Sequence, residues 1–234
     1  MYDHKNIVIR PNTTDENVIK EIFIKKAYLK KKINFDISPD DVWLDGGAHI
    51  GIFSCFVASK GAKKVYSYEP EDQNWILLNK NTMDCSDKTG CKFILEKKAI
   101  NQNGGTGTFT IAPNTWRHSL HTHYKKKLPT TEIDCIGIDE ILNNQPDINC
   151  IKLDIEGSEL EILQNDHDFS KINKLVFEYS FTKDRNMDTF FKCVDKLEKY
   201  FYVDIQKSYY NQNYQGQKGY WGGFIDSIIF CMKK

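Results

Sequence analysis

The sequence predicts an α/β fold built on a largely parallel β-sheet, and three features of the chain support this. Apolar runs suited to buried strands alternate with segments of helical periodicity along most of the 234 residues. Two of these runs, 42–45 and 151–154, end in an aspartate, and glycine follows within three residues. In an open parallel sheet the carboxyl ends of the strands face one crevice, so Asp45 and Asp154 are expected to lie near each other.

Residues 1–40 are expected to form an N-terminal helical element ahead of the sheet. Thr13 and Glu16 have the spacing of a capping box, and apolar residues then recur at helical intervals as far as Phe23. The lysine-rich stretch 25–32 suits a helix C-terminus, where cations complement the helix dipole. We interpret it as a solvated face rather than a phosphate site.

Each later strand is assigned to a short apolar run, and each helix to the periodic stretch that follows one. The expected strands are 42–45, 65–69, 93–95 with a possible extension to Ala99, 151–154, 174–178, 201–205 and 228–232. The expected helices in this part of the chain are 50–59, 74–82, 158–163 and 187–199.

Two segments interrupt this alternation. Residues 101–140 contain strand-like pieces around a polar loop, and residues 206–224 are rich in Tyr, Gln, Asn and Gly. Loops longer than about 12–15 residues tend to be functional or disordered. Both segments are therefore candidate acceptor-binding loops within a single domain that spans residues 1–234.

Composition excludes several classes of protein. The chain has 32 basic and 32 acidic residues, so no net charge draws it to nucleic acid or to a membrane surface. No apolar run approaches the roughly 18 residues of a membrane span, and the first residues do not resemble a signal peptide. The seven cysteines are scattered and never form C-x-x-C, which favours reduced, buried thiols over zinc or disulfides. A cytoplasmic location is expected.

The first acidic strand end has the features of a nucleoside-cofactor site. Gly46, Gly47 and Gly51 allow a tight turn in which the backbone can approach a ligand closely. Asp45 is placed to meet a cationic amino group of such a ligand. Glu69 ends the second strand 24 residues later, where an acid can accept hydrogen bonds from ribose hydroxyls. Lys98 and Ala99, after the third strand, are expected beside the adenine.

Two other interpretations of this turn stay open. A dinucleotide-dependent dehydrogenase uses an acid at the same ribose, but its glycines are spaced G-x-G-x-x-G, whereas here they read G-G-x-x-x-G. An acid directly before the turn would also be poorly placed in such a site, because it would lie close to the negatively charged pyrophosphate. Alternatively, the glycines make only a tight strand-to-helix turn with no ligand.

At this point the chain resembles the FkbM family of methyltransferases, from about residue 10 to residue 178. Four blocks carry the resemblance: the Thr-x-Asp element at residues 13–15, D-G-G-A-H-I-G-I-F-S at 45–54, Y-E-P at 68–70, and I-K-L-D-I-E-G-S-E at 151–159. The last is the most specific. Gly47 and His49 depart from the family pattern, in which valine or isoleucine and asparagine are common.

This resemblance implies a class I methyltransferase fold: a Rossmann-like seven-stranded sheet with helices on both faces and a reversed C-terminal hairpin. It implies S-adenosylmethionine as the cofactor, held by the turn that includes Ala48 and His49 and by Glu69 and Pro70. The family's characterised members mostly methylate hydroxyl oxygens of sugars or of polyketide-type metabolites. A small-molecule or glycan acceptor, such as a sugar or a nucleotide-sugar, is therefore expected.

A hydroxyl nucleophile needs a base within hydrogen-bond reach, and the second acidic block supplies candidates. Asp154 is the first candidate and Glu156 the second; the alternative interpretation is that one acid caps the next helix while the other pairs with a lysine. Together with Glu178 they also suggest a divalent cation. Nothing in their spacing requires one, so no metal site is predicted. Glu159 and Glu161 are expected on the helix surface.

The polar loop adds further candidates. His118 and His121 titrate near neutrality and are alternative catalytic bases. Trp116 and Arg117 are suited to a sugar face and a phosphate, although a surface loop without a ligand has the same composition. An RNA methyltransferase is a rival interpretation, disfavoured by the neutral charge and by only three arginines. A non-catalytic scaffold is another, and the sequence does not specify the oligomeric state.

Overall fold

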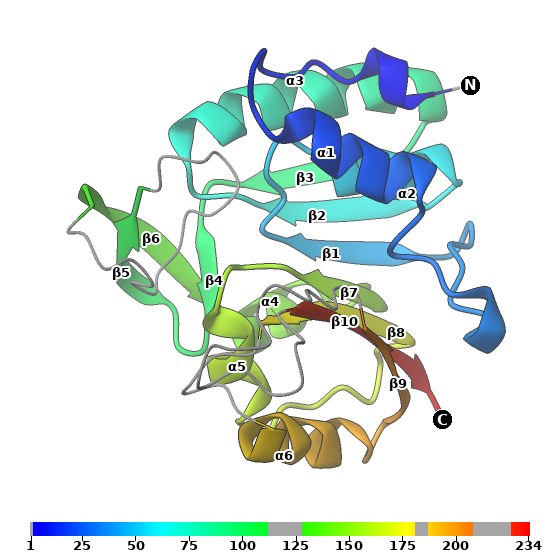
Figure 1. Ribbon diagram of the computed structural model, residues 1–234, viewed down its shortest axis with the longest axis vertical. Helices are drawn as coiled ribbons and strands as arrows, with labels where there is room; N and C mark the ends of the chain where they lie inside the picture. Colours follow the sequence, from blue (N-terminus) through cyan, green and yellow to red (C-terminus); the bar gives the residue numbers. More distant parts are fainter. Residues whose placement is uncertain (1, 112–127, 181–186, 208–225) are drawn as a thin grey trace, which may run out of the picture.

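The protein is described by a computed structural model that covers residues 2–111, 128–180, 187–207 and 226–234. Its centre is a seven-stranded sheet in the order β3-β2-β1-β7-β8-β10-β9 (Figure 1). The strands are β1 (Val42–Gly46), β2 (Lys64–Tyr68), β3 (Lys92–Glu96), β7 (Cys150–Leu153), β8 (Lys174–Ser180), β9 (Phe201–Lys207) and β10 (Asp226–Lys233). The pairs from β3 to β8 are parallel, whereas β10 is antiparallel to both β8 and β9. This is the expected class I methyltransferase arrangement with its reversed C-terminal hairpin.

The central strands read as continuous apolar runs because both faces of the sheet are covered. Along β1, Val42 and Leu44 face one buried cluster while Trp43 faces the other. The first cluster lies under helices of the second half of the chain: α4 (Ile138–Asn144), α5 (Ser158–Leu163) and α6 (Met187–Leu197). The second lies under α2 (Ile52–Ser59), α3 (Asp72–Thr89) and the N-terminal segment (Figure 1).

The first interruption of the alternation forms a second, small sheet. Its strands are β4 (Ala99–Asn101), β5 (Gly105–Thr110) and β6 (Thr130–Gly137), in the order β4-β6-β5. Ala99 therefore belongs to this sheet and not to an extension of the third strand. The small sheet projects beside the carboxyl ends of the main strands (Figure 1). Residues 112–127, the middle of the first candidate acceptor loop, and 208–225, which contain most of the second, lie outside the described residues.

The N-terminal element differs from the expected helix. Helix α1 (Asp15–Ile19) begins after Thr14 and continues as a π-helical turn, η2 (Lys20–Ile24). The Thr13 hydroxyl donates to the carbonyl of Arg10 at 2.9 Å. The capping box predicted at Thr13 and Glu16 is wrong, because Thr14 is the N-cap of α1 and the Thr13 hydroxyl accepts from the amide of Asp15 at 3.3 Å instead. The lysine-rich stretch lies after the helix and includes a short 3₁₀ turn, η3 (Lys31–Ile33). Another 3₁₀ turn, η1 (His4–Asn6), lies before the helix, near the start of the chain.

Other expected elements are confirmed with shifted ends. Helix α3 is longer than predicted, and α4 was not predicted at all. All seven cysteines are buried free thiols. Among the described residues, no helix has the length and apolar character needed to cross a membrane.

Candidate active site

The glycine turn that follows β1 folds over the end of β2. The amides of Gly47 and Ala48 both donate to the carbonyl of Tyr68, at 3.1 and 2.9 Å. Gly47 and Gly51 have positive φ angles of 71° and 87°, and His49 has one of 53°. Histidine, like asparagine, adopts this left-handed conformation more readily than most residues do. His49 therefore fits the turn although asparagine is common there in the family.

Gly47 is required by close contact between two strand ends. A Cβ atom on Gly47 would lie 2.0 Å from the carbonyl oxygen of Asp154, and the amide of Asp154 donates to the carbonyl of Gly46 at 3.2 Å. The turn after β1 and the end of β7 thus touch through their backbones. The two acidic blocks lie beside each other, as the sequence predicts.

A buried lysine joins these same two strands. The ammonium of Lys152, on β7, donates to the carbonyls of Gly46 and Gly47 at 3.1 and 2.9 Å and lies 3.1 Å from Asp45 Oδ1. Asp45 is fully buried, and Ser54 donates to its other oxygen at 2.6 Å. Burial lowers the pKa of Lys152, but the carboxylates beside it outweigh burial and raise the pKa above its ordinary value. In this arrangement the cation next to Asp45 is therefore Lys152 of the protein itself.

Glu69 follows the end of β2 with its carboxylate buried. Its Oε2 accepts from the backbone amide of His49 at 2.8 Å, and its Oε1 accepts from the amide of Glu71 at 3.0 Å and from Asn74 Nδ2 at 3.2 Å. Burial raises the pKa of Glu69 to about 7 in spite of these three donors. Pro70 follows it directly and leads into Glu71, which caps α3 by accepting from the amide of Asn74 at 2.7 Å.

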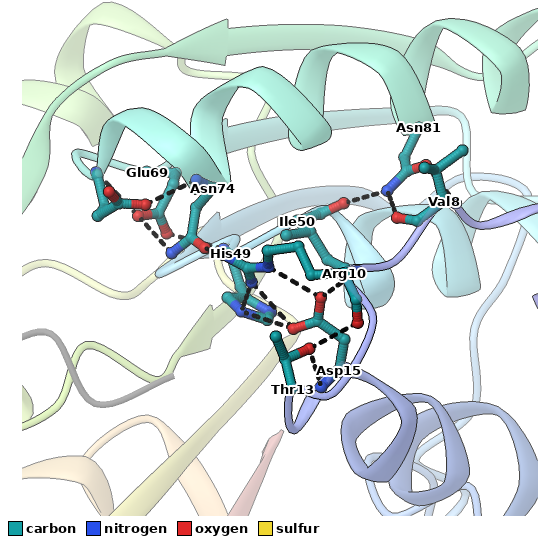
Figure 2. A network of polar contacts seen from close by, with 10 residues as sticks. Val8, Arg10, Thr13, Asp15, His49, Ile50, Glu69, Asn74 and Asn81 are labelled. Atoms are coloured by element: carbon teal, nitrogen blue, oxygen red, sulfur yellow. Dashed lines mark hydrogen bonds and ion pairs between the residues drawn. The ribbon is translucent and has the colours of Figure 1, made fainter. Parts of the chain in front are cut away.

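The N-terminal segment approaches this carboxylate through Arg10 (Figure 2). Arg10 Nε and Nη2 donate to the two oxygens of Asp15 at 3.0 and 2.9 Å. Arg10 Nη1 lies 2.9 Å from Asn74 Oδ1, and Nη2 lies 2.8 Å from His49 Nε2. Asp15 is fully buried; burial alone would raise its pKa, but the hydrogen bonds from Arg10 hold the pKa below its ordinary value.

The two oxygens of the Asp154 carboxylate have different surroundings. The hydroxyl of Tyr28 donates to Oδ2 at 3.2 Å, and Lys152 Nζ lies 3.8 Å from the same oxygen. Oδ1 has no hydrogen-bond partner among the described residues, and the side chain is 32% exposed. Burial and nearby carboxylates, Asp154 among them, raise the pKa of Tyr28 well above its ordinary value, so its hydroxyl stays a donor.

The rest of the second acidic block forms the turn into α5. Glu156 has a positive φ of 52°. Glu159 is buried, and its carboxylate accepts from the amides of Ile155 and Gly157. The prediction that Glu159 lies on the helix surface is wrong, because its carboxylate satisfies the backbone of this turn. Such a turn needs an acceptor for its free amides.

The remaining predicted residues are at the margin or outside the described structure. Lys98 lies 3.8 Å from Glu96 at the end of β3 and is partly exposed, and Ala99 is buried at the start of β4. His118 and His121 lie outside the described residues. In the part of the chain that is described, no group of three or more His, Cys, Asp or Glu side chains is arranged to hold a metal ion.

Sequence reasoning missed several residues of this site. Arg10 is one of only three arginines and lies beside the Thr-x-Asp element, which singles it out without indicating its partners. Lys152 stands between Ile151 and Leu153 in an apolar strand, and a charge in such a strand implies a buried partner. Tyr28 and Asn74 carry no comparable signal.

The site fits a nucleoside cofactor of the kind that the resemblance implies. A carboxylate has about four lone-pair sites, so after its three protein donors Glu69 keeps acceptor capacity for about one ribose hydroxyl. Burial raises the pKa of Glu69 in spite of these donors, so a further hydrogen-bond donor would stabilise its charged form. The positions that side chains of Gly46 and Gly47 would take are occupied by protein atoms, so these two glycines serve the contact between strand ends and not the approach of a ligand that the sequence suggests.

Comparison with known proteins gives a relative of defined activity. The hexuronic acid methyltransferase AglP of Haloferax volcanii is 28% identical over 127 residues, which are 53% of this chain and 49% of AglP. The matched part is therefore about half the length of that relative.

Solved methyltransferase structures are similar over nearly the whole chain. An rRNA methylase from Streptococcus thermophilus has a TM-score of 0.48 and 12% identity, covering 97% of this chain and 98% of its own. A precorrin-6y C5,15-methyltransferase from Geobacter metallireducens has a TM-score of 0.49 and 14% identity, covering 100% and 98%.

The sequence profile described as "Methyltransferase FkbM domain" matches residues 45–203, which is more than half of the chain. This range contains the glycine turn, Glu69 and the second acidic block. The protein belongs to the FkbM family of methyltransferases, and its cofactor is S-adenosylmethionine.

Proposed function

We propose that this methyltransferase acts on a hydroxyl oxygen of a sugar, a glycan or a nucleotide-sugar, with Asp154 as the general base. One observation carries the proposal: Asp154 has one oxygen held by Tyr28 and the other without a partner among the described residues, directly beside the glycine turn. A carboxylate held in this way can accept a proton at its second oxygen without losing its position.

The chemistry requires alignment and one proton transfer. S-adenosylmethionine supplies an electrophilic methyl group on a positively charged sulfur. When bound, it would give up this methyl group to the hydroxyl oxygen, keep the electron pair of the carbon–sulfur bond, and leave as S-adenosylhomocysteine. Asp154 takes the hydroxyl proton through Oδ1, while Tyr28 and Lys152 keep Oδ2 in place. Holding the reacting groups in line provides much of the rate enhancement in such a displacement.

The residues proposed to bind the cofactor surround the ends of β1, β2 and β3. Glu69 accepts a hydrogen bond from a ribose hydroxyl, and the glycine turn lies against another part of the cofactor. Asp45 contributes to the cofactor site indirectly, because it pairs with Lys152, which holds the glycine turn. Direct contact with the cofactor would require the Asp45 carboxylate to exchange partners on binding. The further cofactor-binding residues of this proposal are Gly46, Gly47, Ala48, His49, Gly51, Pro70, Lys98 and Ala99.

The acceptor class is supported by the relative that methylates hexuronic acid. A neutral sugar hydroxyl is a weak nucleophile, which agrees with the need for a base at Asp154. The loops 101–140 and 206–224 are proposed to bind the acceptor. Glu156, His118 and His121 remain the alternative candidates for the base.

Methyl transfer from isotopically labelled S-adenosylmethionine tests this proposal. The acceptors are glucuronic acid, neutral hexoses, their nucleotide-sugars, glucuronate-containing oligosaccharides and total RNA, and mass spectrometry locates the label. We expect a methyl ether on a sugar. Asp154→Asn should lower turnover at least about 100-fold, the scale of general-base catalysis, with S-adenosylhomocysteine affinity unchanged.

The matched variant is Glu156→Gln, which alters the neighbouring acid and should leave most of the turnover. Label on RNA, or label on nitrogen or carbon, would contradict the proposed reaction. Near-normal turnover by Asp154→Asn would remove that residue from the mechanism and move the search to Glu156 and the two histidines.

A further inference from the structure

Residues before the matched family range reach into the cofactor site. The guanidinium of Arg10 contacts three side chains in Figure 2: Asp15 on its own segment, Asn74 on α3 and His49 in the glycine turn. The last two each hold one oxygen of Glu69. Asn74 Nδ2 donates to Oε1 at 3.2 Å, and the backbone amide of His49 donates to Oε2 at 2.8 Å.

Arg10 determines the orientation of Asn74. A guanidinium only donates hydrogen bonds, so the oxygen of the Asn74 carboxamide must face Arg10 Nη1, 2.9 Å away. The amide nitrogen is then turned toward Glu69, where it donates. Without Arg10 the carboxamide could rotate by half a turn and place its oxygen against the carboxylate of Glu69.

The same reasoning applies to His49. Arg10 Nη2 donates to His49 Nε2 at 2.8 Å in the tautomer that leaves this nitrogen without a proton, and the same nitrogen lies 3.5 Å from Asp15 Oδ1. The contact with Arg10 holds the imidazole of His49 in place. The left-handed backbone of the same residue directs its amide to Glu69 Oε2. One guanidinium thus contacts the donors to both oxygens of Glu69.

Asp15 in turn fixes Arg10. Its carboxylate is fully buried and accepts from Arg10 Nε and Nη2 and also from the Arg10 backbone amide at 3.0 Å. Paired carboxylate and guanidinium groups in this two-bond geometry are directional as well as strong. The pair therefore holds the guanidinium in one orientation, beside Asn74 and His49.

We propose that Arg10 and Asp15 are positioning residues of the cofactor site, and that they align the Glu69 carboxylate through Asn74 and His49. This inference rests on the proposed role of Glu69 toward the ribose. It makes the N-terminal segment a functional part of the site, although that segment lies outside the range that the family profile matches.

The test uses the affinity for S-adenosylhomocysteine, measured by isothermal titration calorimetry, so no acceptor is needed. Removing Arg10 alone would leave Asp15 buried and unpaired, which is strongly destabilising. The variant is therefore Arg10→Met with Asp15→Leu, which removes both charges together. We expect its affinity to fall about tenfold, the equivalent of one hydrogen bond to a charged group.

Combining these substitutions with one at Glu69 distinguishes a positioning effect on Glu69 from a general destabilisation of the cofactor site. Glu69→Gln should weaken binding by more than tenfold, and the triple variant should bind no more weakly than Glu69→Gln alone. Asn74→Ala, which removes only the intermediate carboxamide, should reproduce most of the loss and keeps the test valid if the double variant does not fold. Glu16→Gln alters the exposed acid next to Asp15 and should change affinity by less than twofold.

Each other outcome has a distinct meaning. If Glu69→Gln binds normally, the proposed role of Glu69 is wrong. If Glu69→Gln binds weakly while the double variant and Asn74→Ala bind normally, the positioning role of Arg10 and Asp15 is wrong. If the losses simply add in the triple variant, the pair acts independently of Glu69, which also overturns the inference.

Discussion

Gly47 gives the sharpest stability prediction, because its backbone touches the other acidic strand end. In Gly47→Ala the new Cβ would begin 2.0 Å from the carbonyl oxygen of Asp154, about half of a normal contact distance. Neither atom belongs to a flexible side chain, so the turn after β1 and the end of β7 must move apart.

The expected cost has two parts. An alanine at the φ of 71° found here is disfavoured by roughly 1–2 kcal/mol relative to glycine. Displacing packed backbone resembles overpacking of a core, which costs about 1–3 kcal/mol. The sum is about 2–5 kcal/mol, which for a chain of this size lowers the melting temperature by roughly 5–15 °C.

The assay is thermal unfolding followed by circular dichroism, with Gly90→Ala as the matched control. Gly90 has a nearly equal φ of 75°, and nothing lies within 4 Å of the position its Cβ would take. The control therefore reports the conformational cost alone, a few degrees at most. If Gly47→Ala melts no lower than Gly90→Ala, the close contact between the two strand ends is refuted.

Three further predictions follow from the same site. Lys152→Met leaves Asp45 buried without its cation and should lower the free energy of unfolding by about 3–5 kcal/mol, measured by urea denaturation; adding Asp45→Leu should recover most of this, and no recovery would show that the pair is not the cause. Because burial raises the pKa of Glu69 to about 7, S-adenosylhomocysteine affinity should fall as the pH is lowered from 8 to 6 and the carboxylate is protonated; in Glu69→Gln this fall should vanish, and its persistence would assign it to another group. Tyr28→Phe removes the donor to Asp154 and should lower kcat about three- to tenfold on the acceptor found by label transfer, with unchanged cofactor affinity; a loss of cofactor affinity instead would contradict a role limited to Asp154.

Much of the sheet could be predicted because its strands are short apolar runs buried on both faces. The acids at 45, 69 and 154 then follow from strand ends that share one edge. Helix α4 was missed because Ile138–Asn144 is too short to show helical periodicity against the strand before it. The capping box failed because the helix begins one residue later than the spacing implies, with Thr14 as its N-cap.

The network around Glu69 could not be predicted for a different reason. His49 lies 39 residues after Arg10 in the sequence, and Asn74 lies 64 residues after it. Only the packing of the N-terminal segment on α3 brings the three residues together. Each residue alone has an ordinary explanation as a surface or turn residue. The function of the buried Lys152 likewise depends on the register between β1 and β7, which places Asp45 opposite it.

The most direct test of this account is a crystal structure of the protein with S-adenosylhomocysteine. We expect a ribose hydroxyl to donate to the Glu69 carboxylate, with Arg10 still bonded to Asn74 and His49, and the sulfur to face the side of the site that holds Asp154. A ribose bound away from Glu69, or a sulfur screened from Asp154 by the protein, would contradict the proposed site and its mechanism.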